Sequence, residues 1–321
     1  MIKAIPRSKL RDTLYPDYYD YWVSVYKEGV VAECTYKKWD LAGRQLRRLA
    51  PNLKIRNMSA DDMQQILNRY SVDHEHATIL DFWHAIAAPA KRLFAYEGVL
   101  KRDPTYGIVV PEGKPAKKKK KKFLEPEELE RLIKVLEFDQ STYSDGLMIT
   151  IRTGLRFGEL FGITPKDVDL KGMTLSINKT WDYKRNASLD DHYSEFKPTK
   201  NKYSVRKIAM DNITAQCFQR EMGGCKDNET IFGTNTSGFN STWNNVLARI
   251  CKFIDIPVMS VHGLRHEHAS FLASQGVPTK TIAARLGHVD DRITNKVYIH
   301  ETMHDQKRDA RAVMDKLADM Q

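Results

Sequence analysis

A short segment one third of the way along the chain limits what the sequence can fold into. Residues 111–122 contain two prolines, a glycine and an unbroken run of six lysines, and such a segment cannot build a hydrophobic core. We therefore expect an interdomain linker over 111–122, flanked by one domain over 1–110 and another over 123–321. The 321 residues, of which 41% are hydrophobic, suffice for two domains with separate cores.

Charge is divided unevenly by this segment. Residues 1–122 hold 24 Lys and Arg against 14 Asp and Glu, a net charge of +10, whereas 123–321 hold 27 against 27. This asymmetry favours a polyanionic partner such as nucleic acid, because each cation that neutralises a phosphate releases counterions. A merely solvated basic surface is the alternative. No apolar run is long enough to span a bilayer and no apolar signal segment follows Met1, so a cytoplasmic protein is expected, without a membrane partner.

Helical periodicity dominates the first domain. The spacing of apolar residues predicts helices over 17–27, 36–49 and 77–96, and Ser59, followed by acidic residues, predicts the start of another. A four-helix unit of about 100 residues results. Within the last helix, His84 is expected to pack in the core.

The second domain is predicted to be mainly α with a small β-sheet, an α+β arrangement. A helix opens after Phe123 with a proline in its first turn. The run 173–181 alternates like a strand and has a partner at 203–210, and the periodicity is helical again from Trp243. The four cysteines lie far apart without a C-x-x-C pair, so we expect neither a structural zinc site nor a disulfide framework.

Four separated segments of this domain carry reactive residue types. They are Thr153–Leu160, Pro198–Lys202, His262–His266, and Leu286–His288 with Tyr298 ten residues later. Taken singly, Arg156 and Glu159 are explained by a surface ion pair, and the His262 segment by a polar helix face.

Taken together and in order, these segments resemble the tyrosine recombinase (phage integrase) family. The shared pattern is an arginine in a T-G-x-R-x-x-E-L context, a hairpin lysine, an H-x-L-R-H box, an L-G-H box and a tyrosine nine or ten residues further on. The chain looks most like integrases of phages and conjugative transposons. The resemblance implies a helical N-terminal domain that binds core-site DNA, followed by a catalytic domain, and it implies a catalytic set of Arg156, Lys200, His262, Arg265, His288 and Tyr298.

Supporting roles follow from the same resemblance. Glu159 is expected to hold Arg156, and His266 is expected to support the site as well. Lys200 is preferred as the hairpin lysine, with Lys202 as the alternative, and it is expected just before the turn between the two predicted strands.

The chemistry of a phosphodiester accounts for these residue types. Attack at phosphorus builds negative charge on the non-bridging oxygens, and arginines supply fixed cations with forked donors. The phenol of Tyr298 needs a proton acceptor, for which His262 is expected, and the departing 5′ oxygen needs a proton from Lys200. Neither a metal nor another cofactor is expected, since Asp and Glu form no cluster with metal-ligand spacing and a phosphotyrosine retains the bond energy.

The resemblance also implies partners. Double-stranded DNA core sites are expected, with the linker lysines along the backbone, and so is a homotetramer on DNA joined through the amphipathic tail 310–320. The periodicity of this tail is equally explained by packing on its own domain. Accessory DNA-bending or excision proteins belong to the same expectation, as does a bacterial host cytoplasm. The expected DNA-binding lysines are Lys117, Lys118, Lys119, Lys120, Lys121 and Lys122.

Two other functions stay open from the sequence. The segment 271–287 reads like a helix-turn-helix, typical of a transcriptional regulator that does no chemistry. A type IB topoisomerase would share the tyrosine chemistry without site specificity. Many phage and transposon integrases also carry a small arm-binding domain before the helical one. The helical domain here begins almost at Met1, so the natural protein is either the simpler two-domain kind or longer than this chain.

Overall fold

The computed structural model describes residues 5–115, 123–182, 196–199, 202–233, 236 and 238–288. The chain forms two compact units, Met1–Lys118 and Lys119–Gln321. Among the described helices, none combines the length and the apolar character needed to cross a bilayer.

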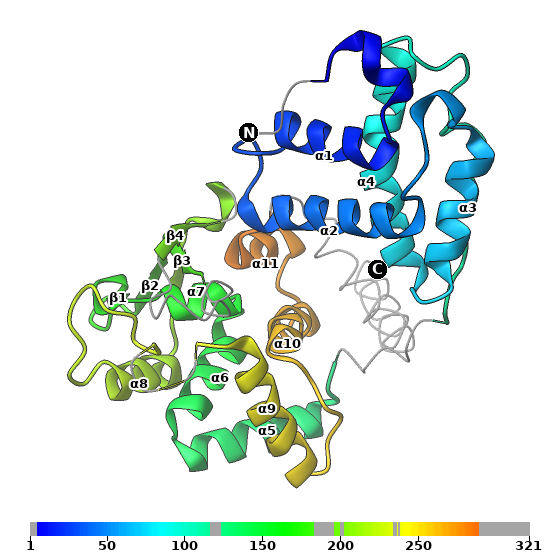
Figure 1. Cartoon of the computed structure of the whole chain (residues 1–321). Helices are drawn as coiled ribbons and strands as arrows, with labels where there is room; N and C mark the ends of the chain where they lie inside the picture. The colour runs from blue at the N-terminus through cyan, green and yellow to red at the C-terminus, as the bar shows by residue number, and fades with distance from the viewer. Residues whose placement is uncertain are drawn as a thin grey trace, which may run out of the picture. The chain divides into compact units, whose positions relative to one another are not determined.

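The first unit contains the four helices expected from the periodicity (Figure 1). They are α1 (Tyr15–Tyr26), α2 (Glu33–Leu49), α3 (Ala60–Ser71) and α4 (His76–Ala95). Ser59 caps α3 as expected: its hydroxyl accepts from the Asp62 amide at 3.2 Å, and the Asp62 carboxylate accepts from the Ser59 amide at 2.9 Å. The expectation for His84 is wrong, because this side chain lies on an exposed side of α4.

Pro111 and Lys114 are hydrogen-bonded to the first residue of α4 and to the loop before it. The Lys114 amide donates to the carbonyl of His74 at 2.8 Å, and a ring nitrogen of His76 lies 2.9 Å from the carbonyl of Pro111. Gly113 has a φ of +69°, and a Cβ there would lie 2.3 Å from the His74 carbonyl oxygen. Only glycine fits at this position. The lysine run 117–122 lies outside the described residues.

The second unit is mostly helical (Figure 1). Its helices are α5 (Pro126–Asp139), α6 (Thr142–Thr153), α7 (Phe157–Gly162), α8 (Asn212–Glu221), α9 (Asn240–Phe253), α10 (Val261–Ser274) and α11 (Thr279–Leu286). Helix α6 contacts α5, α8 and α10, and nearly all of its residues are buried. Its buried side chains belong to the main hydrophobic core of this unit. The residues that follow α6 therefore begin at the end of a helix that is packed on several sides.

Two small antiparallel sheets complete the second unit. Strands β1 (Val168–Asp169), β2 (Thr174–Ile177) and β5 (Arg206–Ala209) form one sheet in the order β1-β2-β5, and β3 (Lys179–Trp181) pairs with β4 (Phe196–Pro198). The β2–β5 pairing brings Ile177 opposite Arg206. The expected mainly α fold with a small sheet is therefore confirmed.

The single strand expected over 173–181 is divided at Asn178. The side-chain amide of Asn178 donates to Asp167 Oδ1 at 2.8 Å, and the ammonium group of Lys179 is paired with the same carboxylate. Both side chains are thus held by the 3₁₀ turn Pro165–Asp167, and the chain leaves the first sheet to start the second.

Candidate functional site

Arg156 is placed by the turn that ends α6. Gly154 closes this helix with a φ of +68°, and its amide donates to the carbonyl of Thr150 at 2.9 Å. A Cβ at this glycine would lie 2.5 Å from Leu286 Cδ2 and 2.8 Å from His268 Cδ2. The backbone of Arg156 is therefore fixed between a buried helix and α7, whose N-cap it forms.

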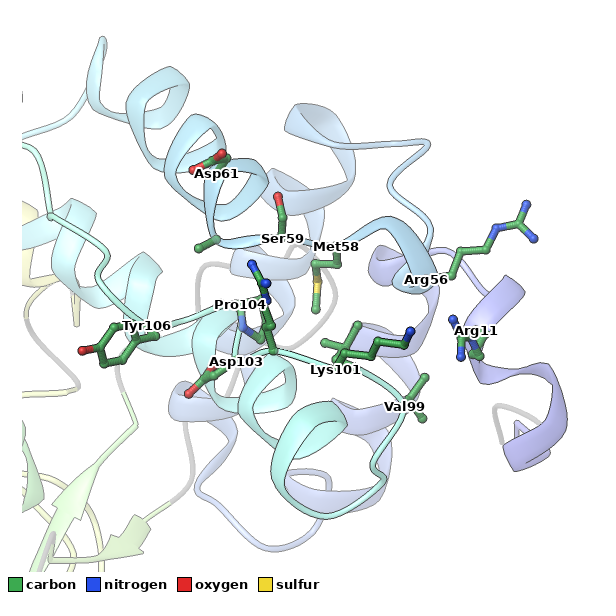
Figure 2. A pocket seen from close by; sticks show the side chains of 13 residues that line it. Arg11, Arg56, Met58, Ser59, Asp61, Val99, Lys101, Asp103, Pro104 and Tyr106 are labelled. Atoms are coloured by element: carbon green, nitrogen blue, oxygen red, sulfur yellow. The ribbon is translucent and has the colours of Figure 1, made fainter.

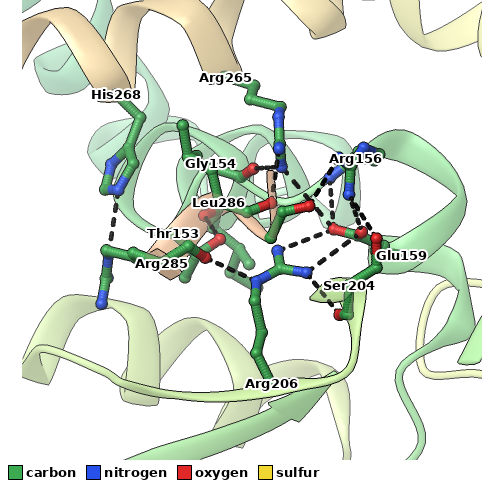
Figure 3. A network of polar contacts seen from close by, with 12 residues as sticks. Thr153, Gly154, Arg156, Glu159, Ser204, Arg206, Arg265, His268, Arg285 and Leu286 are labelled. Carbon is green, nitrogen blue, oxygen red and sulfur yellow. Dashed lines mark hydrogen bonds and ion pairs between the residues drawn. The ribbon is translucent and has the colours of Figure 1, made fainter. Parts of the chain in front are cut away.

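Glu159 gathers three guanidinium groups around one carboxylate, as Figure 3 shows. Arg156 Nη1 lies 2.6 Å from Oε1, Arg206 Nη2 lies 2.9 Å from Oε2, and Arg265 Nη1 lies 3.9 Å from Oε2. The Glu159 side chain is 4% exposed. The ion pair of Arg156 and Glu159 therefore differs from an ordinary surface ion pair, because its carboxylate is buried.

Charge at this carboxylate is fixed by its neighbours. Burial alone raises the pKa of Glu159, but the hydrogen bond and charge of Arg206, with the charges of Arg156 and Arg265, lower it overall below the ordinary value. Glu159 is therefore ionised at neutral pH. Three guanidinium groups against one carboxylate leave a local excess of two positive charges.

The C-terminal end of α11 holds the same three arginines. Arg206 Nε donates to the carbonyl of residue 285 at 2.6 Å, Arg265 Nη2 to that of 286 at 2.6 Å, and Arg156 Nη2 to that of 287 at 3.3 Å. Cations are favourable at a helix C-terminus, where these carbonyls have no partner within the helix. Three consecutive carbonyl groups thus align three side chains that come from different parts of the chain.

His288 follows this helix end directly. Gly287 has a φ of +67°, and a Cβ there would lie 3.0 Å from Arg206 Nη1. Burial, followed by the charges of Arg265, Arg156 and Arg206, lowers the pKa of the half-buried His288 to about 4. Its imidazole is neutral at neutral pH, with one ring nitrogen as a donor and the other as an acceptor.

Arg265 is the most enclosed of the three cations. Its side chain is 3% exposed, and Nη1 donates to the carbonyl of Gly154 at 2.5 Å. Burial and the charge of Arg156 lower the pKa of Arg265, against the opposing effect of Glu159. The guanidinium nevertheless stays protonated at neutral pH, as arginine does in proteins.

His262 and His266 occupy successive turns of α10. Their rings make an edge-to-face contact with centroids 4.9 Å apart and planes at 84°. His262 is exposed and His266 is half-buried, whereas Arg265, between them in sequence, turns into the core. The hydroxyl of Ser260 caps α10 by accepting from the Gly263 amide at 3.1 Å.

The structure therefore brings Arg156, Glu159, Arg265 and His288 together, with His262 and His266 in mutual contact on α10. Tyr298, Lys200 and the lysines of 117–122 lie outside the described residues, as does the tail 310–320. Position 200 falls between β4 and the 3₁₀ turn Lys202–Ser204, which precedes β5. No group of three or more His, Cys, Asp or Glu side chains suited to a metal occurs in the part of the chain that the structure describes.

Arg206 is a member of this cluster that the sequence analysis missed. A signal was available, because Arg206 and Ile208 point to the same face of strand β5 by the twofold periodicity of strands. Ile208 is buried, and an arginine on that face requires buried acceptors.

A basic cavity on the first unit was also missed. It measures about 810 Å³ and lies between the 3₁₀ turn Arg7–Asp12, the start of α3 and the segment after α4 (Figure 2). Four cations line it against two carboxylates, Asp61 and Asp103. The cations are Arg11, Arg56, Lys101 and Arg102.

Comparison with known proteins shows that this chain is similar to integrases. The phage integrase family matches residues 122–305. The ICEBs1 integrase of Bacillus subtilis (strain 168) is 29% identical over 239 residues, which cover 70% of this chain and 61% of that protein. The integrase of Staphylococcus phage L54a is 33% identical over 163 residues, which cover 47% of this chain and 45% of that protein. The chain thus spans about three fifths of the first relative and less than half of the second.

Structural similarity extends over both units. A solved structure of the Tn1549 transposon integrase in complex with transposon right end DNA has a TM-score of 0.76 to this chain at 21% identity, covering 95% of this chain and 100% of that one. This likeness confirms the expected fold. Because the family match covers more than half of the sequence, the chain belongs to the phage integrase family of tyrosine recombinases.

Proposed function

We propose that this chain is a site-specific DNA recombinase that integrates or excises a mobile element. It cuts and rejoins DNA strands through a 3′-phosphotyrosine intermediate formed on Tyr298. The observation that carries the proposal is the cluster of three arginines held by Glu159 and by the end of α11, directly before His288. A fixed excess of positive charge with forked donors suits one backbone phosphate.

Arg156 is the member of the cluster that is open to a ligand. Its side chain is 29% exposed, against 6% for Arg206 and 3% for Arg265. We assign Arg156 a direct contact with the non-bridging oxygens. Arg265 contributes its positive charge from its buried position. His288 adds a neutral hydrogen-bond donor. Because the groups are already aligned, little reorganisation is needed as charge builds at phosphorus.

The proposed step begins when the hydroxyl oxygen of Tyr298 attacks the phosphorus. The bond from phosphorus to the 5′ oxygen breaks, and the 3′ phosphate is joined to the tyrosine. His262 accepts the phenol proton, and Lys200 donates a proton to the departing 5′ oxygen. The reverse attack by a 5′ hydroxyl rejoins the strand, so neither ATP nor a metal enters the balance.

DNA core sites are the proposed partner. The basic lining of the cavity on the first unit and the lysines Lys117–Lys122 supply phosphate contacts that do not depend on the base sequence. We further propose a homotetramer on DNA joined through the tail 310–320, accessory DNA-bending or excision proteins, and action in the cytoplasm of a bacterial host. These assignments extend the family membership to partners.

Covalent capture tests the proposal and identifies the DNA target in the same experiment. The protein is expressed in a host that carries the element, denatured rapidly, and recovered with any DNA attached to it, which is then sequenced. A nicked duplex with the recovered sequence serves as substrate for the purified protein. We expect an adduct with the wild type and none with Tyr298→Phe.

Other outcomes separate the alternatives. DNA protection without any strand cleavage would favour a regulator, and relaxation of any supercoiled plasmid would favour a topoisomerase. An adduct that persists in Tyr298→Phe would remove Tyr298 from the proposal.

A further inference from the structure

Arg206 is nearly saturated by acceptors of the protein itself. Nε donates to the carbonyl of Arg285 at 2.6 Å, and Nη1 donates to the carbonyl of Ser204 at 2.9 Å. Nη1 and Nη2 also reach the two carboxylate oxygens of Glu159, at 3.2 and 2.9 Å. This guanidinium therefore makes four hydrogen bonds while its side chain is 6% exposed.

These contacts argue against a direct role of Arg206 on DNA. A phosphate oxygen would have to displace a buried carboxylate or a backbone carbonyl, and each displaced acceptor would lose its partner without access to water. Arg156, on the same carboxylate, has the more exposed side chain. The two arginines thus share one anchor, but only Arg156 is open to a ligand.

Arg206 joins Glu159 to the end of α11 by bonds of 2.9 and 2.6 Å, whereas Arg156 lies 3.3 Å from its α11 carbonyl and Arg265 lies 3.9 Å from Glu159. Glu159 orients Arg156 through its Nη1 at 2.6 Å and through its backbone amide at 3.0 Å. The end of α11 receives Arg156 and Arg265 at the next two carbonyls after the one that Arg206 holds. Arg206 contacts both anchors at once and rises from β5, a third element.

We propose that Arg206 is a positioning residue of the recombination site, which locks Glu159 to the end of α11 so that Arg156 and His288 face the same phosphate. This inference rests on the proposed function. It assigns Arg206 an effect on the cleavage step through Glu159, with little effect on DNA affinity.

Lysine cannot replace arginine in this position. A guanidinium is planar and presents its donors as a fork, so it can hold both oxygens of a carboxylate and a carbonyl on its other side. An ammonium group keeps the charge but lacks that geometry. Arg206→Lys therefore separates the geometry from the charge.

A matched control exists elsewhere in the same unit. Arg220 on α8 donates two hydrogen bonds to the carboxylate of Asp145 on α6, from Nε at 2.9 Å and from Nη2 at 2.5 Å. The Asp145 side chain is 1% exposed. This pair likewise joins an arginine fork to a buried carboxylate, but its residues are not part of the proposed site. Arg220→Lys should reproduce a general loss of stability without a loss of chemistry.

The experiment measures single-turnover adduct formation on a nicked duplex that carries the sequence recovered by covalent capture. It also measures the Kd for that duplex. Arg206→Lys should slow adduct formation by about 10- to 100-fold, the equivalent of hydrogen bonds to a charged group. Its Kd should stay within about 3-fold of the wild type. Arg220→Lys should leave both quantities within the same range. Thermal unfolding of both variants shows whether their stabilities match.

A double-mutant cycle then tests whether Arg206 acts through Glu159. Glu159→Gln should itself slow adduct formation. In the double variant, adding Arg206→Lys should lower the rate of adduct formation by less than about a further 3-fold. Costs that multiply would mean that Arg206 acts independently, which overturns the inference.

Remaining outcomes are equally decisive. Wild-type rates in Arg206→Lys would overturn this inference alone, whereas a wild type that forms no adduct would overturn the proposed function. If Arg206→Lys does not fold, Glu159→Gln carries the test, and wild-type cleavage in that variant would overturn the inference.

Discussion

Arg265 and Gly154 are 111 positions apart in sequence, and the guanidinium of one donates to the carbonyl oxygen of the other at 2.5 Å. The bond joins the middle of α10 to the turn that ends α6. It fixes the backbone two residues before Arg156, so one arginine of the cluster helps to place the next. The geometry of the site therefore depends on backbone acceptors as much as on side chains.

Removal of the guanidinium at position 265 should destabilise the second unit strongly. Arg265→Met would leave the carbonyls of Gly154 and Leu286 without this donor inside the core. We expect a loss of about 3–5 kcal/mol in the free energy of unfolding, as for the removal of one partner of a buried ionic network. Urea unfolding followed by circular dichroism measures it. A loss below about 1 kcal/mol would show that these carbonyls find other donors.

Substitution of Gly154 should combine strain with a collision. Gly154→Ala places a Cβ 2.5 Å from Leu286 Cδ2 in a left-handed backbone conformation. We expect a loss of about 2–4 kcal/mol, from about 1–2 for the conformation and the rest from overpacking. Gly276→Ala is the control, because Gly276 has a φ of +76° with nothing within 4 Å of a Cβ. Equal losses in the two variants would rule out the collision.

Stability should depend on pH through His268. Burial, followed by the charges of Arg285 and Arg265, lowers the pKa of His268 to about 3, although the Ile151 carbonyl and Asp211 act in the opposite direction. Below the unfolded pKa of about 6.5 the unfolded chain binds the extra proton. The free energy of unfolding should therefore fall as pH drops from about 6.5 towards 3, by up to about 1.4 kcal/mol per pH unit from this group.

A variant isolates that contribution. His268→Asn cannot titrate, and it also loses the acceptor that Arg285 Nε contacts at 3.1 Å. We expect it to be less stable at pH 7 and to show a weaker pH dependence in urea unfolding between pH 7 and 4. An unchanged slope would assign the acid sensitivity to other groups.

Tyr298→Phe should abolish covalent attachment while DNA binding persists, since only the nucleophilic oxygen is removed. Denaturing gel electrophoresis of labelled nicked duplex measures the adduct, and filter binding measures the affinity. The matched control is Tyr203→Phe, because Tyr203 is an exposed tyrosine of the same unit. Loss of the adduct in both variants would point to a general defect in folding.

Much of the fold could be predicted from the sequence because local signals were strong. Ser59 with Asp62 marked the start of α3, and Pro126 marked the start of α5. The division of the 173–181 strand was missed because its cause, Asp167, belongs to a separate turn. His84 was misplaced because the buried stripe of α4 runs through Ile79, Phe82 and Ile86, and position 84 lies on the opposite side of the helix.

The candidate site was predicted less completely, for a physical reason. Arg156 and Glu159 are neighbours in sequence, so their pairing can be predicted from spacing. The acceptors of Arg206 come from Ser204, Glu159 and the end of α11, and two of these are carbonyl groups. Backbone carbonyls leave no signature in a sequence, so the network that aligns the arginines becomes visible only in the structure.

The three carbonyls at the end of α11 make the geometry of the site depend on the length of this helix. Their contribution comes from the main chain, so side-chain changes at 285 and 286 that preserve packing leave the acceptors in place. Insertion of one residue within α11 would instead rotate its last turn by about 100° and advance it by about 1.5 Å, so that each arginine would face a different atom. Relatives of this protein should therefore tolerate substitutions in α11 far more readily than insertions or deletions.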